Sequence, residues 1–255
     1  MDRKIRNGLK FLWIFFYSAI IITWTIFSAA LDGWLALCAG IFSGSWARSI
    51  ARAWCIHIIW ITGSKLSVEG LENIDRSKHY VFVANHQSYF DIPALYAGIG
   101  SSISFIAKKE LFGIPFFGWG MWAIGCIKID RKNPRKARES LSKGVAALKK
   151  NNISLVIFPE GTRSLSGKVG EFKRASFTLA IEAGVPVVPV AISGTRDIQK
   201  KSSLQISSAT VHIVIGKPIP ADEYLKTGKE GLAEKARETI IKILDKKINT
   251  IAELL

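Results

Sequence analysis

A long uncharged run near the amino terminus is the feature that most restricts how this chain can fold. No charged side chain occurs from Phe11 to Leu31, a span of 21 residues. A helix of about 20 apolar residues is long enough to cross the hydrocarbon core of a membrane. Asp32 and Gly33 interrupt the pattern, and a second, shorter uncharged run continues to Ala47. The two runs predict a helical hairpin that turns at Asp32–Gly33 and either spans the membrane or dips into one leaflet.

The residues around these runs support a membrane location. Basic side chains precede the first run and follow the second at Arg48 and Arg52, which places both ends in the cytoplasm by the positive-inside tendency. Residues 50–63 predict an amphipathic helix that lies along the interface. A cleavable signal peptide and a buried pair of soluble helices are the alternatives. The sequence favours membrane insertion over both, and the run is longer than the ~7–15 apolar residues of a signal peptide.

Charge and cysteine content narrow the classes of partner. The chain has 255 residues, enough for one large domain or two small ones, and a formal net charge of +15. Such a charge suggests nucleic acid, an anionic membrane surface or an acidic partner. The apolar amino terminus favours the membrane, and no nucleic-acid-binding motif accompanies the charge. The three scattered cysteines argue against a disulfide framework, and the four histidines lack metal-ligand spacing, so neither a metal nor a resident cofactor is expected.

From residue 64 onward, short apolar strands alternate with helical stretches, which predicts an α/β fold with a mostly parallel sheet flanked by helices. The expected strands are 66–70, 81–84, 103–107, 126–131, 153–158, 187–192 and 209–215, and the expected helices are 135–150, 175–183 and 232 onward. Strand 66–70 is expected at an edge, and strand 187–192 at an edge or with a bulge because it contains Pro189. Residues 111–122 are apolar but broken by glycine and proline, which predicts an apolar wall beside a site or against lipid. We therefore expect an anchoring helical segment, residues 1–63, followed by an α/β domain, residues 64–255.

The strand at 81–84 ends in Asn85 and His86, and Asp91 follows five residues after the histidine. Ser88 and Asp91 have the spacing of a helix N-cap and its third residue. His86 is therefore expected in a strand-to-helix turn at the carboxyl end of a strand, where open α/β sheets bind ligands. Across this turn Asp91 can accept a hydrogen bond from the imidazole, which would orient the ring and raise its basicity. Taken alone, such a pair is more often a capping acid beside a packed histidine.

Three further expected strands also end in polar groups, which carry the cations Lys108, Arg131 and Arg163. Because the carboxyl ends of parallel strands meet at one rim, these groups are expected to line a single crevice with His86. Cations around a base suggest a substrate that carries a phosphate at one end and loses a proton at the other. Arginine suits such a substrate because its planar guanidinium can donate two parallel hydrogen bonds to phosphate oxygens.

The last of these strand ends is the turn Glu160-Gly161-Thr162-Arg163. Gly161 allows the backbone to turn tightly, and Thr162 offers a hydroxyl or an amide to a substrate. Glu160 has three open interpretations: it anchors Arg163, it binds a substrate hydroxyl, or it forms a structural ion pair.

Four blocks occur in order along the chain: Asn85–Asp91, Ala107–Arg131, Phe158–Ser164 and Val185–Val190. Together they resemble the glycerolipid acyltransferase family, and most closely its bacterial members that act on 1-acyl-sn-glycerol-3-phosphate. The first block fits the His-x4-Asp motif of that family, and the third fits its Glu-Gly-Thr-Arg turn.

The resemblance implies a role for each matching residue. In such enzymes the histidine is held to be the general base and the aspartate its partner, which implies these roles for His86 and Asp91. The implied substrate-binding residues are Lys108, Arg131, Glu160, Gly161, Thr162, Arg163 and Lys173. One departure is Ala175, where the family commonly has glycine, so the contact at Lys173 is expected to differ.

The implied reaction moves a fatty acyl chain from a thioester to the 2-hydroxyl of 1-acyl-glycerol-3-phosphate, giving phosphatidic acid. The expected donor is acyl carrier protein or coenzyme A, and the expected location is the cytoplasmic face of a bacterial inner membrane. The alternatives are another lysophospholipid, glycerol 3-phosphate or an aminolipid as acceptor, and a non-enzymatic adaptor held to anionic lipid by charge.

Overall fold

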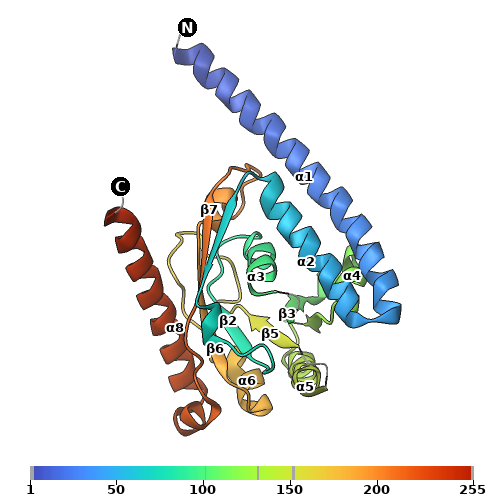
Figure 1. The fold of residues 1–255 in the computed structure, drawn as a ribbon, viewed down its shortest axis with the longest axis vertical. Helices are drawn as coiled ribbons and strands as arrows, with labels where there is room; N and C mark the ends of the chain where they lie inside the picture. Colours follow the sequence, from blue (N-terminus) through green and yellow to red (C-terminus); the bar gives the residue numbers. More distant parts are fainter. Residues whose placement is uncertain (1–2, 101, 131, 151–152, 254–255) are drawn as a thin grey trace.

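The computed structural model describes residues 3–100, 102–130, 132–150 and 153–253. Seven strands of these residues form one sheet in the order β1-β7-β6-β2-β5-β3-β4, with helices on both faces (Figure 1). The strands are β1 Lys65–Glu69, β2 Val81–Ala84, β3 Ile103–Lys108, β4 Ile127–Ile129, β5 Ser154–Ile157, β6 Val187–Ser193 and β7 Thr210–Ile215. The helices are α1 Arg3–Phe42, α2 Gly44–Ile61, α3 Asp91–Ile99, α4 Phe117–Ala123, α5 Pro134–Lys150, α6 Thr178–Ala183, α7 Thr195–Ile198 and α8 Ala221–Glu253, with short 3-10 turns η1 Leu71–Asn73, η2 Lys109–Gly113 and η3 Arg174–Phe177. The predicted α/β fold is confirmed.

The direction of the strands determines where polar groups can meet. Strands β6, β2, β5, β3 and β4 are all parallel to one another, whereas β7 is antiparallel to β6 and parallel to the edge strand β1. The carboxyl ends of five neighbouring strands therefore reach the same rim of the sheet. Every residue of β2 and of β5 is buried, which explains why β2 and the three residues of β5 after Ser154 are all apolar.

The sheet separates two apolar cores. Phe82 and Ala84 of β2 pack on the side of α2 and α3, and Val81 and Val83 pack on the side of α5, α6 and α8, because successive strand residues point to opposite faces. Ala236 and Ile240, on the apolar stripe predicted for the last helix, are fully buried. Burial of a side chain such as Ile240 contributes about 1.5–3 kcal/mol to folding.

Strand β6 is central, so of the two expectations for the proline-containing strand, an edge position or a bulge, the edge position is wrong. The proline is tolerated because the pairing with β7 is interrupted beside it. The antiparallel ladder starts at Val190↔Ile215, and the next pairing is an isolated bridge, Val187↔Ile219. The carbonyl of Pro189 lies between them and accepts a hydrogen bond from the Gly216 amide at 2.8 Å. A residue without a backbone N–H therefore falls where the ladder does not require one.

The predicted hairpin turn at Asp32–Gly33 is wrong, because α1 runs unbroken from Arg3 to Phe42 and the chain turns at Ser43. A Cβ atom added at Gly33 would lie 2.5 Å from the carbonyl oxygen of Phe116, and one added at Gly120 would lie 2.6 Å from Gly33 Cα. The glycine thus permits close contact between α1 and the start of α4. The second uncharged run is divided between α1 and α2, and the expected interfacial helix at 50–63 is part of α2.

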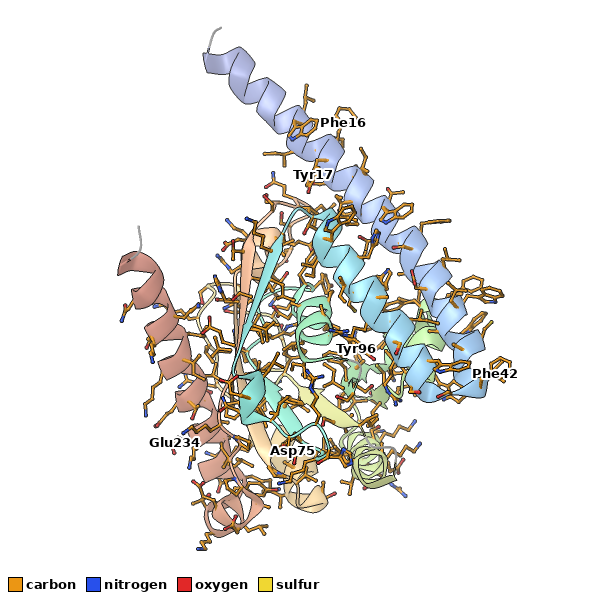
Figure 2. All side chains as sticks on the ribbon, viewed as in Figure 1. Phe16, Tyr17, Phe42, Asp75, Tyr96 and Glu234 are labelled. Atoms are coloured by element: carbon orange, nitrogen blue, oxygen red, sulfur yellow. The ribbon has the colours of Figure 1, made fainter. Side chains whose placement is uncertain are left out.

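One helix of the described residues, Leu12–Phe42, is long and apolar enough to cross a membrane, with a mean hydropathy of 1.9. Its outward side chains remain exposed, Trp13 by 71% and Phe16 by 60%, and the amino-terminal part of α1, which carries Phe16, extends past the α/β body (Figure 2). Helix α2 bridges α1 and the body, because the Trp54 ring nitrogen donates a hydrogen bond to the Ser28 hydroxyl of α1 at 3.0 Å while Ile58 is buried in the core. The apolar helix indicates membrane association, and the segments 1–63 and 64–255 share one core.

We expect the substitution Gly33→Ala to destabilise the protein. The added methyl group would collide with the backbone at Phe116, which cannot move without displacing α4, and overpacking of this kind costs about 1–3 kcal/mol. Denaturant unfolding of the protein in detergent measures the change. Gly113→Ala is the matched control, because no atom lies within 4 Å of its added Cβ. Equal stability of the Gly33→Ala protein and the wild type would contradict the close contact.

Candidate active site

His86 and Asp91 form a hydrogen-bonded pair at the end of β2. The imidazole Nδ1 lies 2.6 Å from Asp91 Oδ2, and the same oxygen accepts hydrogen bonds from the backbone amides of Gln87 at 2.6 Å and Ser88 at 2.9 Å. Asp91 is fully buried. An ionised carboxylate only accepts hydrogen bonds, so Nδ1 is the donor, and in the neutral imidazole Nε2 then carries the lone pair. The predicted contact across the turn is present, and it prepares Nε2 to receive a proton.

The turn differs from the predicted capping box in one half. Asp91 does bond back to the Ser88 amide, but helix α3 begins only at Asp91. The Ser88 hydroxyl accepts a hydrogen bond from the Phe90 amide at 3.3 Å rather than from the Asp91 amide, and it donates one to the carbonyl of Gln199 at 2.8 Å. Ser88 therefore ties the histidine turn to the segment that follows β6.

A third side chain, Thr195, completes the environment of Asp91 and is absent from the residues predicted by sequence. Its hydroxyl donates to Asp91 Oδ1 at 2.5 Å, and Thr195 is fully buried. Thr195 opens α7 directly after β6, whose carboxyl end lies at the same rim as that of β2. The signal was present, since Ser193-Gly194-Thr195 ends an apolar strand with polar residues as the other strand ends do.

Asn85 fixes the spacing between the carboxyl ends of β2 and β6. Its side-chain amide donates to the carbonyl of Ile192 at 2.9 Å and accepts from the Ile192 amide at 2.8 Å. Both hydrogen bonds are buried, where hydrogen-bond networks of this kind hold a single geometry. The asparagine before the histidine therefore holds β2 against β6.

An aromatic ring packs against the imidazole. The ring of Phe158 stacks on that of His86 with a centroid separation of 4.1 Å and an interplanar angle of 21°. Phe105 lies beyond Phe158 with a centroid separation of 6.5 Å. The His86 side chain is still 16% exposed. Stacking on Phe158 and the bond to Asp91 restrict the ring while leaving part of it accessible.

Glu160 holds the loop after β5 against the histidine turn. Its Oε1 accepts from the His86 amide at 2.8 Å and its Oε2 from the Gly170 amide at 3.1 Å, while the Ser164 amide donates to the His86 carbonyl at 2.7 Å. Burial raises the pKa of Glu160 above its ordinary value, and the two backbone hydrogen bonds oppose that shift. Among the described residues Glu160 forms no ion pair with Arg163, so the anchoring role suggested by the sequence is not seen; the carboxylate binds backbone amides instead.

The loop that Glu160 holds is surrounded by cationic side chains. Gly161 has a positive φ of 70°, and a Cβ added there would lie 2.8 Å from the ammonium of Lys173, so that side chain lies over the glycine. The Thr162 hydroxyl accepts a hydrogen bond from Lys201 at 3.1 Å. The Arg163 guanidinium stacks 3.6 Å above the ring of Tyr89, a favourable cation–π arrangement. This loop can bind an anion next to His86.

The other two predicted cations are placed differently. Lys108 ends β3 on the same rim, two strands from β2, and its ammonium pairs with Glu110 at 3.6 Å. Its neighbour Lys109 pairs with Asp130 at 2.7 Å, and this hydrogen bond lowers the pKa of Asp130 and raises that of Lys109. Arg131 lies outside the described residues, so its expected place beside His86 stays a prediction.

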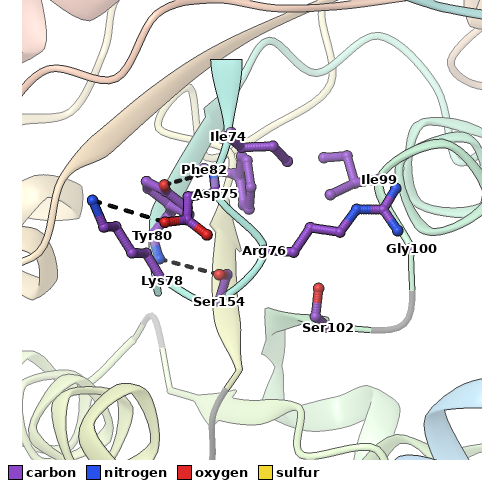
Figure 3. Close-up of a pocket in the computed structure, with 10 residues that line it drawn as sticks. All are labelled: Ile74, Asp75, Arg76, Lys78, Tyr80, Phe82, Ile99, Gly100, Ser102 and Ser154. Carbon is purple, nitrogen blue, oxygen red and sulfur yellow. Dashed lines mark hydrogen bonds and ion pairs between the residues drawn. The ribbon is translucent and has the colours of Figure 1, made fainter. Parts of the chain in front are cut away.

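Two cavities lie away from this rim. One of about 230 Å³ opens at the amino ends of β2 and β5, where Lys78 pairs with Asp75 at 3.9 Å (Figure 3). The other, of about 550 Å³, lies between α4, β4 and α5 and is lined by Trp119 and Trp122. Neither cavity is lined by His86, which instead lies where the loops after β2, β5 and β6 meet. Within the described residues no three His, Cys, Asp or Glu side chains are placed to hold a metal ion.

The Acyltransferase family model matches residues 65–193 of the chain. The human 1-acyl-sn-glycerol-3-phosphate acyltransferase alpha is 30% identical over 229 residues, which cover 90% of this chain and 80% of that protein. The 1-acyl-sn-glycerol-3-phosphate acyltransferase of Pseudomonas aeruginosa is 35% identical over 191 residues, which cover 73% and 72%. A chloroplastic enzyme of the same name from Arabidopsis thaliana is 37% identical, and the chain spans about half its length, 53%.

A solved structure also matches the whole arrangement. The crystal structure of the 1-acyl-sn-glycerophosphate (LPA) acyltransferase PlsC from Thermotoga maritima superposes with a TM-score of 0.78 at 29% sequence identity. The match covers 96% of this chain and 97% of that protein, so it includes the amino-terminal helices as well as the α/β body.

Proposed function

Because the chain belongs to the acyltransferase family, we propose that it transfers a fatty acyl chain from a thioester to the 2-hydroxyl of 1-acyl-glycerol-3-phosphate, giving phosphatidic acid. One observation carries the proposal: the base and the anion-binding loop form one hydrogen-bonded unit. Glu160 bonds to the His86 amide at 2.8 Å, and the loop that begins at Glu160 is flanked by Arg163, Lys173 and Lys201. A phosphate bound at this loop brings the hydroxyl of the same molecule toward the imidazole.

The residues suggest a direct transfer. His86 Nε2 takes the proton from the 2-hydroxyl as the oxygen attacks the thioester carbonyl, and Asp91 stabilises the imidazolium that forms. When the tetrahedral intermediate collapses, the carbon–sulfur bond breaks and the imidazolium returns its proton to the leaving thiolate. General-base assistance of this kind contributes about 10²–10⁴-fold to the rate. The cations at the loop bind the acceptor through its phosphate, with arginine supplying a planar fork and lysine a point charge.

The donor and the location are further parts of the proposal. The donor is the thioester of acyl carrier protein or of coenzyme A, and no resident cofactor is needed for the transfer. The net charge of +15 favours an acidic donor and anionic lipid. The exposed apolar side chains of α1 support a location at a membrane. The basic residues Arg48 and Arg52 after the apolar runs favour the cytoplasmic face of a bacterial inner membrane. Both lipid substrate and product would then remain in the bilayer.

The test is transfer of labelled acyl chains to a panel of acceptors by the protein in detergent or vesicles. We expect turnover with 1-acyl-glycerol-3-phosphate, and much less with glycerol 3-phosphate, with lysophosphatidylcholine or with an aminolipid. Palmitoyl-coenzyme A and palmitoyl-acyl carrier protein are compared as donors. A preference for another acceptor would replace the proposed substrate, and absence of transfer to every acceptor would favour a membrane adaptor.

Arg163→Ala is expected to weaken acceptor binding more than it slows chemistry. A hydrogen bond to a charged group is worth about 1.5–3 kcal/mol, so KM for 1-acyl-glycerol-3-phosphate should rise by tenfold or more. The matched control is Arg196→Ala, because the Arg196 guanidinium donates a hydrogen bond to the Leu165 carbonyl at 2.9 Å and does not belong to the turn 160–163. Steady-state kinetics at fixed donor concentration measure both variants. An unchanged KM in the Arg163→Ala protein would remove this arginine from the phosphate site.

A further inference from the structure

The segment after β6 brings an additional lysine to the anion-binding loop. Lys201 lies just beyond α7, and its position is set from several sides. Thr195 bonds to Asp91, Ser88 bonds to the Gln199 carbonyl at 2.8 Å, and the Gln199 side chain donates to the Ser203 carbonyl at 3.1 Å. The backbone that carries Lys201 is therefore attached to the catalytic pair.

The ammonium of Lys201 sits directly on the loop. Its Nζ donates to the Arg163 carbonyl at 2.8 Å and to the Thr162 hydroxyl at 3.1 Å. Lys173 covers the same loop from Gly161. The ammonium groups of Lys173 and Lys201 thus contact residues 161–163, next to the turn that carries His86. The Arg163 guanidinium adds a third positive charge to this loop.

The hydrogen bonds that Lys201 makes to the loop do not require its positive charge. Both of its acceptors are neutral, and no ion pair with a carboxylate is found for it among the described residues. A neutral donor would hold the loop equally well, whereas an ammonium group has three N–H donors, two of which are used here. A positive charge left uncompensated beside a base is suited to an anionic ligand.

We propose that Lys201 is a substrate-binding residue that, together with Arg163, selects the dianionic phosphate monoester of the acceptor. This inference rests on the proposed function. A phosphate monoester carries about 1.5–2 negative charges near pH 7 because its second pKa is about 6, whereas a phosphodiester headgroup carries one. Lys201 adds a positive charge beside that of Arg163, which matches the dianionic monoester, so loss of Lys201 should penalise the monoester more than it penalises a diester.

Two substitutions separate the charge from the hydrogen bonds. Lys201→Gln keeps donors that can reach the loop but removes the charge, and Lys201→Met keeps only the apolar stem. Lys201→Arg keeps the charge. Lys200→Met is the matched control, because Lys200 is the exposed neighbour. Initial rates are measured with 1-acyl-glycerol-3-phosphate and with lysophosphatidylglycerol as the monoester and diester acceptors.

We expect Lys201→Gln and Lys201→Met to raise KM for the monoester about tenfold, with kcat changed much less and with a smaller effect on the diester. Lys201→Arg and Lys200→Met should stay close to the wild type. If Lys201→Gln behaves like the wild type, the lysine only holds the loop and the proposal is overturned. The same conclusion follows if kcat falls while KM is unchanged, whatever the thermal stability of the variants. If the wild type is active, either of these two negative results overturns only the role of Lys201 and leaves the proposed function intact. If the wild type is inactive on every acceptor, the proposed function itself is overturned.

Discussion

His86→Ala is expected to lower kcat for acyl transfer by about 10²–10⁴-fold, the contribution typical of a positioned general base. KM for the acceptor should change little, because the cations at the loop after β5 remain. The expected loss follows from the geometry at the end of β2, where Asp91 holds the Nδ1 proton and leaves Nε2 as the acceptor. Single-turnover rates with labelled donor give the chemical step directly.

His79→Ala is the control for this experiment. His79 precedes β2, at the amino end of the strand that carries His86 at its carboxyl end, and its loss should leave the rate unchanged. Thermal unfolding of both variants shows whether the fold is kept. Full activity of a folded His86→Ala protein would exclude a catalytic role for the imidazole and favour a non-enzymatic membrane protein.

Asp91→Asn is expected to impair both stability and catalysis. The buried carboxylate accepts four hydrogen bonds, from the His86 ring, the Gln87 and Ser88 amides and the Thr195 hydroxyl. An amide nitrogen cannot accept, so at least one buried donor is left unpaired at a cost of about 1–3 kcal/mol. The imidazole also loses the partner that holds its tautomer. Replacing the corresponding aspartate of a Ser-His-Asp triad by asparagine lowers kcat by about 10⁴-fold, and we expect a loss approaching that scale.

Asp197→Asn is the control, since Asp197 is exposed on the neighbouring α7 and should tolerate the change. Denaturant unfolding measures the loss of stability, and kcat at saturating donor and acceptor measures the loss of catalysis. A stable Asp91→Asn protein with wild-type kcat would show that the carboxylate serves neither purpose. Loss of stability with kcat retained in the folded fraction would reduce Asp91 to a structural role.

Several features of the site were readable from the sequence because their partners are close in the chain. The bond between His86 and Asp91 spans five residues and depends on a strand that ends before a helix, both of which the local pattern predicts. The strand ends at Lys108 and Glu160 were recognisable for the same reason, and the parallel sheet followed from the alternation of strands and helices.

Features that depend on partners far apart in the chain were not readable. Gly33 has the same local appearance as a turn residue, and only the packing of α1 on α4 shows that it permits close contact. Glu160 lies 74 residues from His86, whose backbone amide donates a hydrogen bond to it, and Thr195 lies 104 residues from Asp91. No local pattern could assign these pairs, although the polar end of β6 was visible.

The sequence by itself determined the chemistry of this protein: an apolar helix for a membrane, an imidazole with its carboxylate, and a turn rich in polar groups. Tertiary structure alone decided which of these groups meet. The order β6-β2-β5 brings three strand ends from distant parts of the chain to one rim, and Thr195 and Lys201 reach the site only through it. The physical reason is that hydrogen bonding within a turn is local, whereas the order of strands depends on how the whole chain buries its apolar faces.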